Sequence, residues 1–181
     1  MSCPQNPKPA KLVIGILLSE KQLLQAVADD LQNVYGNIDM VSLWMDFEYT
    51  DYYSREMGKP LFRRMFVFTQ LVEQMELSKI KQYTNMLEHK YAVSDRRRVN
   101  IDPGYLLYER FVLATGKNYS HRIYIGDGIY ADLTLIFQKG AYQSLPWTYP
   151  DYQDEGMKAF LALVRQKYSI DVKKQEQFLM E

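Results

Sequence analysis

Side chains capable of acid-base or metal chemistry gather in the stretch "SHRIYIGDGIYADL", residues 120–133. Apolar and polar residues alternate there, and Asp127-Gly128 accepts the positive φ angles of a two-residue turn, so the stretch predicts a β-hairpin. In that hairpin His121 lies diagonal to Asp132, close enough for the two side chains to meet. A carboxylate that fixes the tautomer of a histidine suits proton transfer or metal binding. His121 and Asp132 are therefore the candidate catalytic pair, with a purely structural pair as the alternative.

The neighbouring Arg122 falls on the other, apolar face of the same hairpin. The expected register pairs Gly126 with Ile129 and Ile123 with Asp132, which directs Arg122 toward the core. An unpaired charge in the core is costly. The guanidinium must therefore either reach a buried carboxylate or emerge into a cavity, and the sequence leaves both open.

A divalent metal is one use for this pair. Glu48, near the end of an alternating stretch, is a third candidate ligand beside His121 and Asp132. Metal ions need several converging oxygen or nitrogen ligands, so a metal site requires the fold to bring these residues together. The sequence itself identifies no cofactor and no metal.

A second candidate site is built from arginines. Arg63 and Arg64 open one expected strand, and Arg98, the last of three consecutive arginines, precedes another. If the two strand starts are neighbours, these side chains form a basic rim beside Asp102, which precedes a proline and predicts the start of a helix. Arginine forks and helix N-termini both suit an anion such as phosphate. The alternatives are a solvent-exposed charge run and an Asp102 that only caps its helix.

Two aromatic segments offer surfaces on which a ligand can stack. The first, "EYTDYYSREMG" at 48–58, contains Tyr52 and is long for a connection, as binding loops and lids are. The second, "PWTYPDY" at 146–152, contains Trp147 between prolines. The alternative for the second segment is a strap that covers an otherwise open sheet.

Hydrophobic periodicity predicts the elements that position these residues. Short apolar or alternating runs predict strands at 12–19, 40–48, 64–72 and from 96, before the hairpin. Amphipathic stripes predict helices after a capping box at Ser19–Gln22, at 77–91, at 103–115 and at 157–168.

The order of these elements predicts an α+β fold. The first six match the ferredoxin-like βαββαβ arrangement, which a helix, the β-hairpin and a C-terminal helix then extend. We expect a disordered tail at 1–10, a single domain at 11–170 and a frayed charged tail at 171–181.

The composition narrows the class of protein. The 181 residues include 22 Lys plus Arg and 22 Asp plus Glu, and this balance argues against nucleic-acid binding through bulk charge. No apolar stretch approaches the roughly 20 residues of a membrane span. The single cysteine, Cys3, excludes an intrachain disulfide and is in keeping with a reducing cytoplasm.

Several motifs together resemble a known family. "TDYYSREMG", "LFRR", "RRVNIDPGYL", "SHRIYIGDGIYADLTLIF" and "LPWTYPDY" resemble, in this order, the bacterial family called domain of unknown function 4416, from about Lys11 to Tyr168. The resemblance implies a short cytoplasmic bacterial protein without an established activity, and it supplies no catalytic residues. Relatives are sometimes labelled GTP-binding, but this sequence lacks the phosphate-loop pattern Gly-x-x-x-x-Gly-Lys-Ser/Thr.

Three functions follow as hypotheses. The first is binding of a small anionic or nucleotide-like ligand by the arginine rim, Asp102, Arg122 and the aromatic segments. The second is a metal-dependent phosphoester hydrolase that uses His121 and Asp132. The third is a protein-interaction module, with a homodimer left open as a partner state.

Overall fold

The computed structural model describes residues 1–94 and 96–178. Over these ranges the strands are β1 (Ala10–Leu18), β2 (Ile38–Val41), β3 (Met45–Asp46), β4 (Phe62–Val72), β5 (Val99–Leu106), β6 (Arg110–Thr115), β7 (Arg122–Gly126), β8 (Ile129–Gln138) and β9 (Ala141–Ser144). The helices are α1 (Leu24–Tyr35), α2 (Ser54–Met57), α3 (Leu77–Lys90), α4 (Pro150–Gln153) and α5 (Glu155–Phe178), with 3-10 turns at Lys21–Leu23 and Gln74–Glu76. The fold is α+β, as predicted.

All nine of these strands belong to one antiparallel sheet. Its order is β2-β4-β1-β5-β6-β8-β7, with β3 paired to β4 and β9 paired to β8. Strand β1 is fully buried along its length because it lies between β4 and β5, and this explains its continuous apolar sequence.

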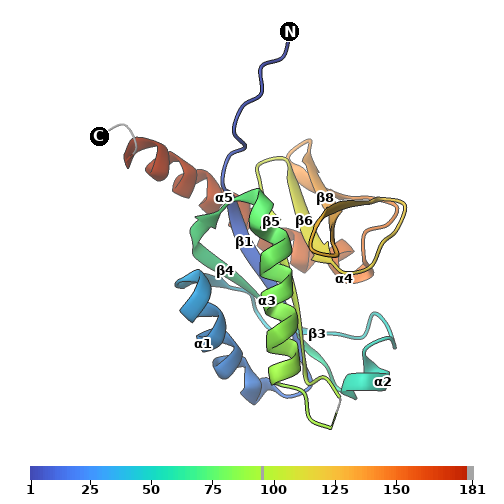
Figure 1. Ribbon diagram of the computed structural model, residues 1–181. Helices are drawn as coiled ribbons and strands as arrows, with labels where there is room; N and C mark the ends of the chain where they lie inside the picture. Colours follow the sequence, from blue (N-terminus) through green and yellow to red (C-terminus); the bar gives the residue numbers. More distant parts are fainter. Residues whose placement is uncertain (95, 179–181) are drawn as a thin grey trace.

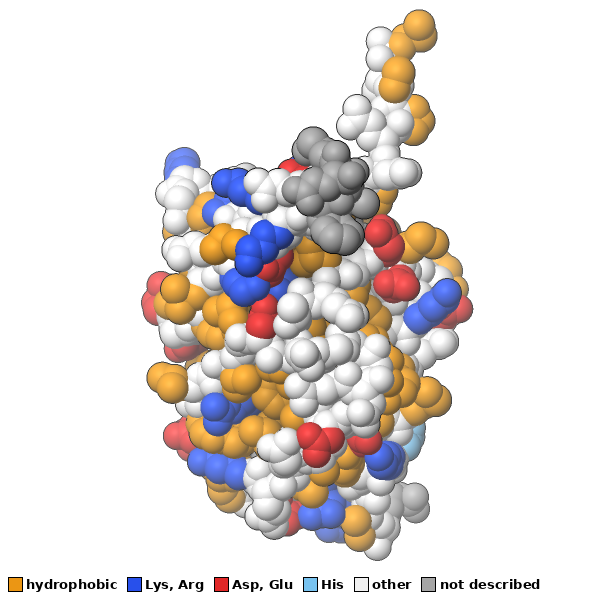
Figure 2. Space-filling model, turned by 90° about the vertical axis from the view of Figure 1, so that its left-hand side faces the viewer, with side chains coloured by type: hydrophobic (Ala, Val, Ile, Leu, Met, Phe, Trp, Pro, Cys, Tyr) orange, Lys and Arg blue, Asp and Glu red, His pale blue; other side chains and the backbone are white. Residues whose placement is uncertain are grey.

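Helices cover the sheet on both faces (Figure 1). α1 and α3 pack on one face against alternate residues of β1, including Leu12, Ile14 and Ile16. α4 and α5 pack on the other face, where Tyr152 and Tyr168 are almost fully buried. Side chains of both charges are interspersed with hydrophobic ones on the face shown in Figure 2.

The C-terminal helix is longer than the sequence indicates. Its predicted stripe is confirmed, because Met157, Leu161 and Val164 are fully buried. However, α5 continues to Phe178, where a frayed tail is expected from residue 171. The extra turns are anchored by Lys11, whose ammonium binds Asp171 at 2.6 Å.

The predicted helix at 103–115 is wrong. β5 runs through Pro103, and β6 returns antiparallel to it. Almost every side chain of both strands is buried, rather than one helical stripe, because these strands lie in the middle of the sheet. Asp102 therefore caps no helix, and the expected anion site at a helix start does not form.

Two smaller expectations also fail. Ser19 donates its hydroxyl to the Arg98 carbonyl instead of capping a helix, and a 3-10 turn precedes α1. The strand expected at 40–48 is interrupted between β2 and β3, where Leu43 is 86% exposed. Phe47, near the end of the expected strand, is buried.

The hairpin forms, but its register differs from the expected one. Asp127 and Gly128 form the turn with positive φ angles of 55° and 74°, and Gly126 pairs with Ile129 as predicted. A bulge between Tyr124 and Gly126 then shifts the pairing by one residue. Arg122, rather than Ile123, therefore lies opposite Asp132.

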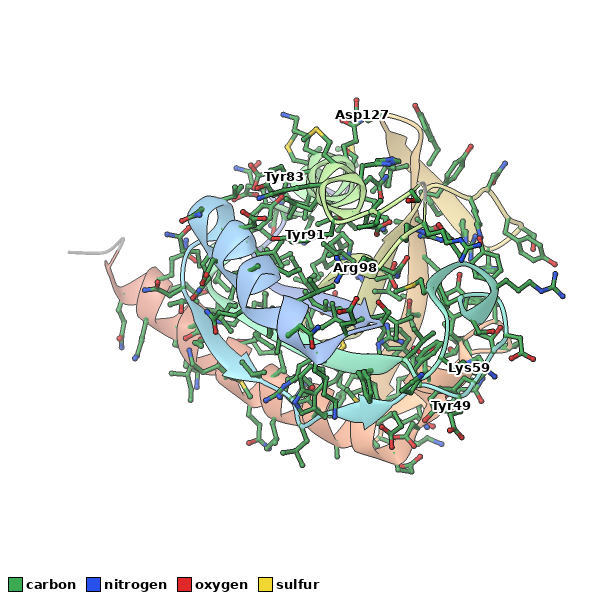
Figure 3. The ribbon with its side chains drawn as sticks, turned by 90° about the horizontal axis from the view of Figure 1, so that it is seen from below. Tyr49, Lys59, Tyr83, Tyr91, Arg98 and Asp127 are labelled. Atoms are coloured by element: carbon green, nitrogen blue, oxygen red, sulfur yellow. The ribbon has the colours of Figure 1, made fainter. Side chains whose placement is uncertain are left out.

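The turn itself is docked on α3. The Ser78 hydroxyl donates to the Asp127 carboxylate at 3.0 Å, and the Gln82 amide donates to the Asp127 carbonyl at 3.2 Å. Figure 3 shows Asp127 beside this helix. These contacts position the whole β7–β8 ribbon relative to α3.

Candidate functional site

A cavity of about 740 Å³ opens where α3, α4, the ends of β5 and β6, and the segment before β4 meet. Its aromatic wall comes from residues 47–53 and from α4. Its polar floor comes from the sheet, α3, α4 and the residues just before β5 and just after β6. The wall residues are Phe47, Tyr49, Tyr52, Tyr53, Tyr149 and Tyr152. The floor residues are Arg63, Lys81, Asn85, Glu88, Arg97, Asn100, Asp102, Lys117, Asp132 and Asp151.

The register of three strands explains why the floor converges. Leu17 of β1 pairs with Arg63 on one side and Asn100 on the other, and Gly15 pairs with Asp102. A Cβ atom at Gly15 would lie 3.1 Å from the Arg63 guanidinium. Glycine at this position therefore leaves the space into which the arginine side chain extends.

Arg63 is the central buried cation of the floor. The side chain pairs with the Asp151 carboxylate and donates from Nη2 to the Tyr152 hydroxyl at 3.0 Å. Burial raises the pKa of Tyr152 to about 12, so this hydroxyl stays protonated at neutral pH. These contacts attach α4 to β4 and close one side of the cavity.

Asp102 is the most accessible of the lining carboxylates. It accepts a hydrogen bond from the Asn100 amide at 2.7 Å and lies 3.5 Å from the Lys81 ammonium. Its side chain is 27% exposed, against 9% for Glu88, 8% for Asp151 and 1% for Asp132. A ligand in the cavity would therefore meet Asp102 before the other three.

Glu88 is held in the floor by several donors. Its carboxylate accepts from the Ile101 N–H at 2.8 Å and lies 3.6 Å from the Lys81 ammonium and 3.3 Å from Arg97. Burial raises the pKa of Glu88, although these partners favour its charged form. The raised pKa makes stability depend on pH at this position.

We expect the stabilising effect of Glu88 to be greatest in acid. Because its pKa is higher in the folded than in the unfolded protein, that effect is complete below the unfolded pKa of about 4.5 and is lost as the pH rises through the folded pKa. The free energy of unfolding of the wild type, minus that of Glu88→Gln, should therefore fall in urea titrations as the pH rises above about 4.5. A difference that rises over this range would contradict the assignment.

The predicted His121–Asp132 pair is present despite the shifted register. His121 Nε2 lies 3.2 Å from Asp132 Oδ2, although His121 itself precedes β7. The ring also stacks on Trp147, with centroids 4.8 Å apart and planes 11° apart. Asp132 borders the cavity, whereas His121 and Trp147 do not line it.

Arg122 resolves the alternatives left by the sequence. Its Nε donates to Asp132 at 2.9 Å, and its guanidinium also donates to the Lys117 carbonyl and the Tyr149 hydroxyl. The arginine therefore reaches a buried carboxylate. Its role in the cavity is indirect, since it holds Asp132, Tyr149 and the chain at Lys117 in place.

The expected arginine rim does not assemble. Arg63 lines the cavity, but Arg64 lies over the Trp44 ring at 4.7 Å and Arg98 binds Glu20 with an Nε–Oε1 distance of 2.9 Å. Successive strand residues point to opposite faces, which separates Arg63 from Arg64. In Figure 3, Arg98 lies close to α1 and α3, whereas Tyr49 and Lys59 lie farther from these two helices.

Other lining residues were missed by the sequence interpretation. Arg97, and not Arg98, lines the cavity from the arginine run, and Lys117 lines it just beyond β6. Lys81 and Glu88 are seven residues apart on α3, on the same side as its buried apolar stripe. Charged residues within an apolar stripe are a signal that could have identified both.

The metal candidates do not form a ligand set. Across residues 1–94 and 96–178, no three His, Cys, Asp or Glu side chains form a group that could hold a metal ion. Glu48 is exposed and does not line the cavity beside Asp132. Metal binding by His121, Asp132 and Glu48 therefore lacks the geometry it requires.

Comparisons with known proteins give a match to one family model. Residues 8–168 match the model of the family described as Domain of unknown function (DUF4416). No curated protein and no solved structure matches the chain. Every helix in the described part of the chain is too short or too polar to cross a membrane.

Proposed function

We propose that this chain, which belongs to the DUF4416 family, binds one small nucleotide-like ligand in the cavity between α3, α4 and residues 47–53. The observation that supports this most strongly is the combination of an aromatic wall with an accessible carboxylate, Asp102, at the floor. Ligand pockets are typically concave, largely aromatic or apolar, and furnished with a few polar groups that fix orientation.

The size and the wall of the cavity suit a planar ring. Its volume of about 740 Å³ falls within the range of about 300–1,000 Å³ found for small-molecule sites. Tyr49 and Tyr52 are 44% and 55% exposed, so their rings are available for stacking. Stacking of a base on an aromatic side chain contributes about 1–3 kcal/mol.

The floor can recognise the polar edge of such a ring. The Asn85 amide offers both a donor and an acceptor, and the Asp102 carboxylate accepts hydrogen bonds from amino or hydroxyl groups. A ligand that pairs with both groups gains hydrogen bonds that fix its orientation in the cavity. This complement of groups favours a nucleoside moiety over a purely apolar ligand.

Filling the cavity should abolish binding. Gly116 lines it, and a Cβ atom at that position would meet no atom within 4 Å, so Gly116→Trp should fold while its indole occupies the opening. We expect ribonucleosides or their 5′-phosphates to stabilise the wild type in thermal-shift assays, by about 2.7 kcal/mol at one hundred times Kd. Gly116→Trp should lose this shift.

The matched control is Gln143→Trp, at an exposed position of β9 away from the cavity. It should respond to ligand like the wild type. Absence of any shift of the wild type at millimolar concentrations of every nucleoside and nucleotide would overturn the proposal. Equal shifts in Gly116→Trp and the wild type would place binding elsewhere.

We also propose that the ferredoxin-like arrangement is the core of a single folding unit. The chain order β1-α1-β2-β4-α3-β5 and the sheet order β2-β4-β1-β5 support it, as does the packing of α1 and α3 on one face. One cooperative unfolding transition, reported alike by circular dichroism and tryptophan fluorescence, is the result expected for a single unit.

A further inference from the structure

Residues 48–60, here called the covering segment, connect β3 to β4 and carry α2. The segment supplies Tyr49, Tyr52 and Tyr53 to the cavity wall. It is attached to the body by a small cluster in which Tyr53 and Met57 pack against Leu17 and neighbours. Figure 1 shows α2 at the periphery of the molecule, away from the main helical layers.

The four cationic side chains that line the cavity bind partners in different parts of the fold. Arg63 and Lys81 pair with groups of the sheet, α3 and α4. Arg97 and Lys117 instead make their closest side-chain contacts to the covering segment. Arg97 and Lys117 are therefore held in part by the covering segment.

The contact to Arg97 has the geometry of an anion site. Glu56 binds it in a two-pronged manner, with Nε–Oε1 and Nη2–Oε2 distances of 2.8 and 2.6 Å. A guanidinium presents the same fork to a phosphate group. The Glu56 side chain is 36% exposed, so its carboxylate can move into solvent.

Arg97 would keep its place without Glu56. Its Nη1 still donates to the Asn100 amide oxygen at 2.9 Å and to Glu88 at 3.3 Å. Lys117 donates to the Tyr52 hydroxyl at 2.8 Å, a neutral acceptor that an anion would outcompete. Both cations are thus available to a ligand once the covering segment releases them.

We propose that Glu56 and Tyr52 occupy the positions that a phosphate group of the ligand takes on Arg97 and Lys117. This rests on the proposed function and assigns the ligand to the phosphate monoesters. Binding then exchanges the Glu56 carboxylate for the phosphate, and Glu56 acts as an internal competitor. A purely structural Glu56–Arg97 pair is the opposing explanation, and it predicts no gain in affinity when the carboxylate is neutralised.

Titration calorimetry with the ribonucleosides and their 5′-monophosphates separates the two explanations. Glu56→Gln should bind the monophosphate about tenfold more tightly than the wild type, with the affinity for the parent nucleoside unchanged. Arg97→Gln should reduce the affinity for the monophosphate toward that for the nucleoside, with Lys117 as the remaining cation of the proposed phosphate site. Glu155→Gln, which neutralises a 90% exposed glutamate of α5, is the charge-matched control and should behave like the wild type.

The outcomes distinguish this inference from the function on which it rests. The wild type and Glu56→Gln could both bind the nucleoside and prefer the monophosphate to the same degree. That result would overturn the exchange of the Glu56 carboxylate for the phosphate, but not the ligand site itself. Absence of binding by the wild type to both compounds would overturn both. Thermal unfolding of each variant, measured without ligand, confirms that the comparison is made between folded proteins.

Discussion

Gly104→Ala should lower the free energy of unfolding by about 3 kcal/mol, the upper end of the usual cost of overpacking a core. A Cβ atom at this buried position of β5 would lie 2.4 Å from the backbone carbonyl oxygen of Val112 on β6. A backbone atom within the sheet cannot move aside as a flexible side chain would. Urea denaturation of the variant and the wild type measures the difference.

This substitution also decides between two structures of the segment at 103–115. In the helix that the sequence predicts, Gly→Ala stabilises by about 1 kcal/mol, so the sign would be reversed. Gly116→Ala, just beyond β6, is the matched control, because its Cβ would meet no atom within 4 Å. The free energy of unfolding of Gly116→Ala should lie within about 1 kcal/mol of that of the wild type. Stabilisation by Gly104→Ala would contradict the pairing of β5 with β6.

Lys11→Met should destabilise the fold by about 3 kcal/mol, as expected when one partner of a buried ion pair is removed. The Lys11 side chain is fully buried, and its ammonium lies 3.0 Å from Asp39 and 2.6 Å from Asp171. The substitution leaves these two carboxylates with Lys167 as their remaining cation. Chemical denaturation measures the loss.

An exposed lysine provides the control for this substitution. Lys8 pairs with Glu176 at 3.1 Å, but the two side chains are 59% and 49% exposed, so Lys8→Met should cost less than about 1 kcal/mol. Equal effects of the two substitutions would show that the buried cluster adds nothing specific to stability.

The buried cluster also predicts a dependence on pH. Burial alone would raise the pKa of Asp171, but hydrogen bonds from Lys11 and Lys167 keep it below its usual value. The stability contributed by Asp171 is therefore present above about pH 3.8 and is lost as the pH falls through the folded pKa. The difference in the free energy of unfolding between the wild type and Lys11→Met should therefore become smaller as the pH falls.

Local patterns predict the elements that short-range periodicity or turn chemistry defines. The apolar run of β1, the stripes of α1, α3 and α5, and the Asp127-Gly128 turn follow from periodicity and turn chemistry. The segment 103–115 was misassigned because its apolar residues fit a helix as well as two central strands. The pairing of β5 with both β1 and β6 decides between them, and the pairing with β1 joins segments that are far apart in the sequence.

The candidate site is harder to predict from the sequence, because contacts between distant segments form it. Tyr52, Arg63, Asp102 and Asp132 were chosen from the sequence and line one cavity, although Asp102 was expected to start a helix. Arg97 was passed over because the choice within an arginine run depends on which side chain faces the cavity. That orientation is fixed by β5 and by Glu56, far away in the sequence.

A nuclear magnetic resonance titration of the labelled protein with a ribonucleoside 5′-monophosphate tests the ligand site most directly. The account predicts that shifted backbone amide signals cluster at residues 49–56, at Arg97 and at 115–117, around the cavity opening. Signals of β9 and of the α5 end near Asp171 should stay in place. Shifts confined to those distant regions, or none at saturating ligand, would contradict the account.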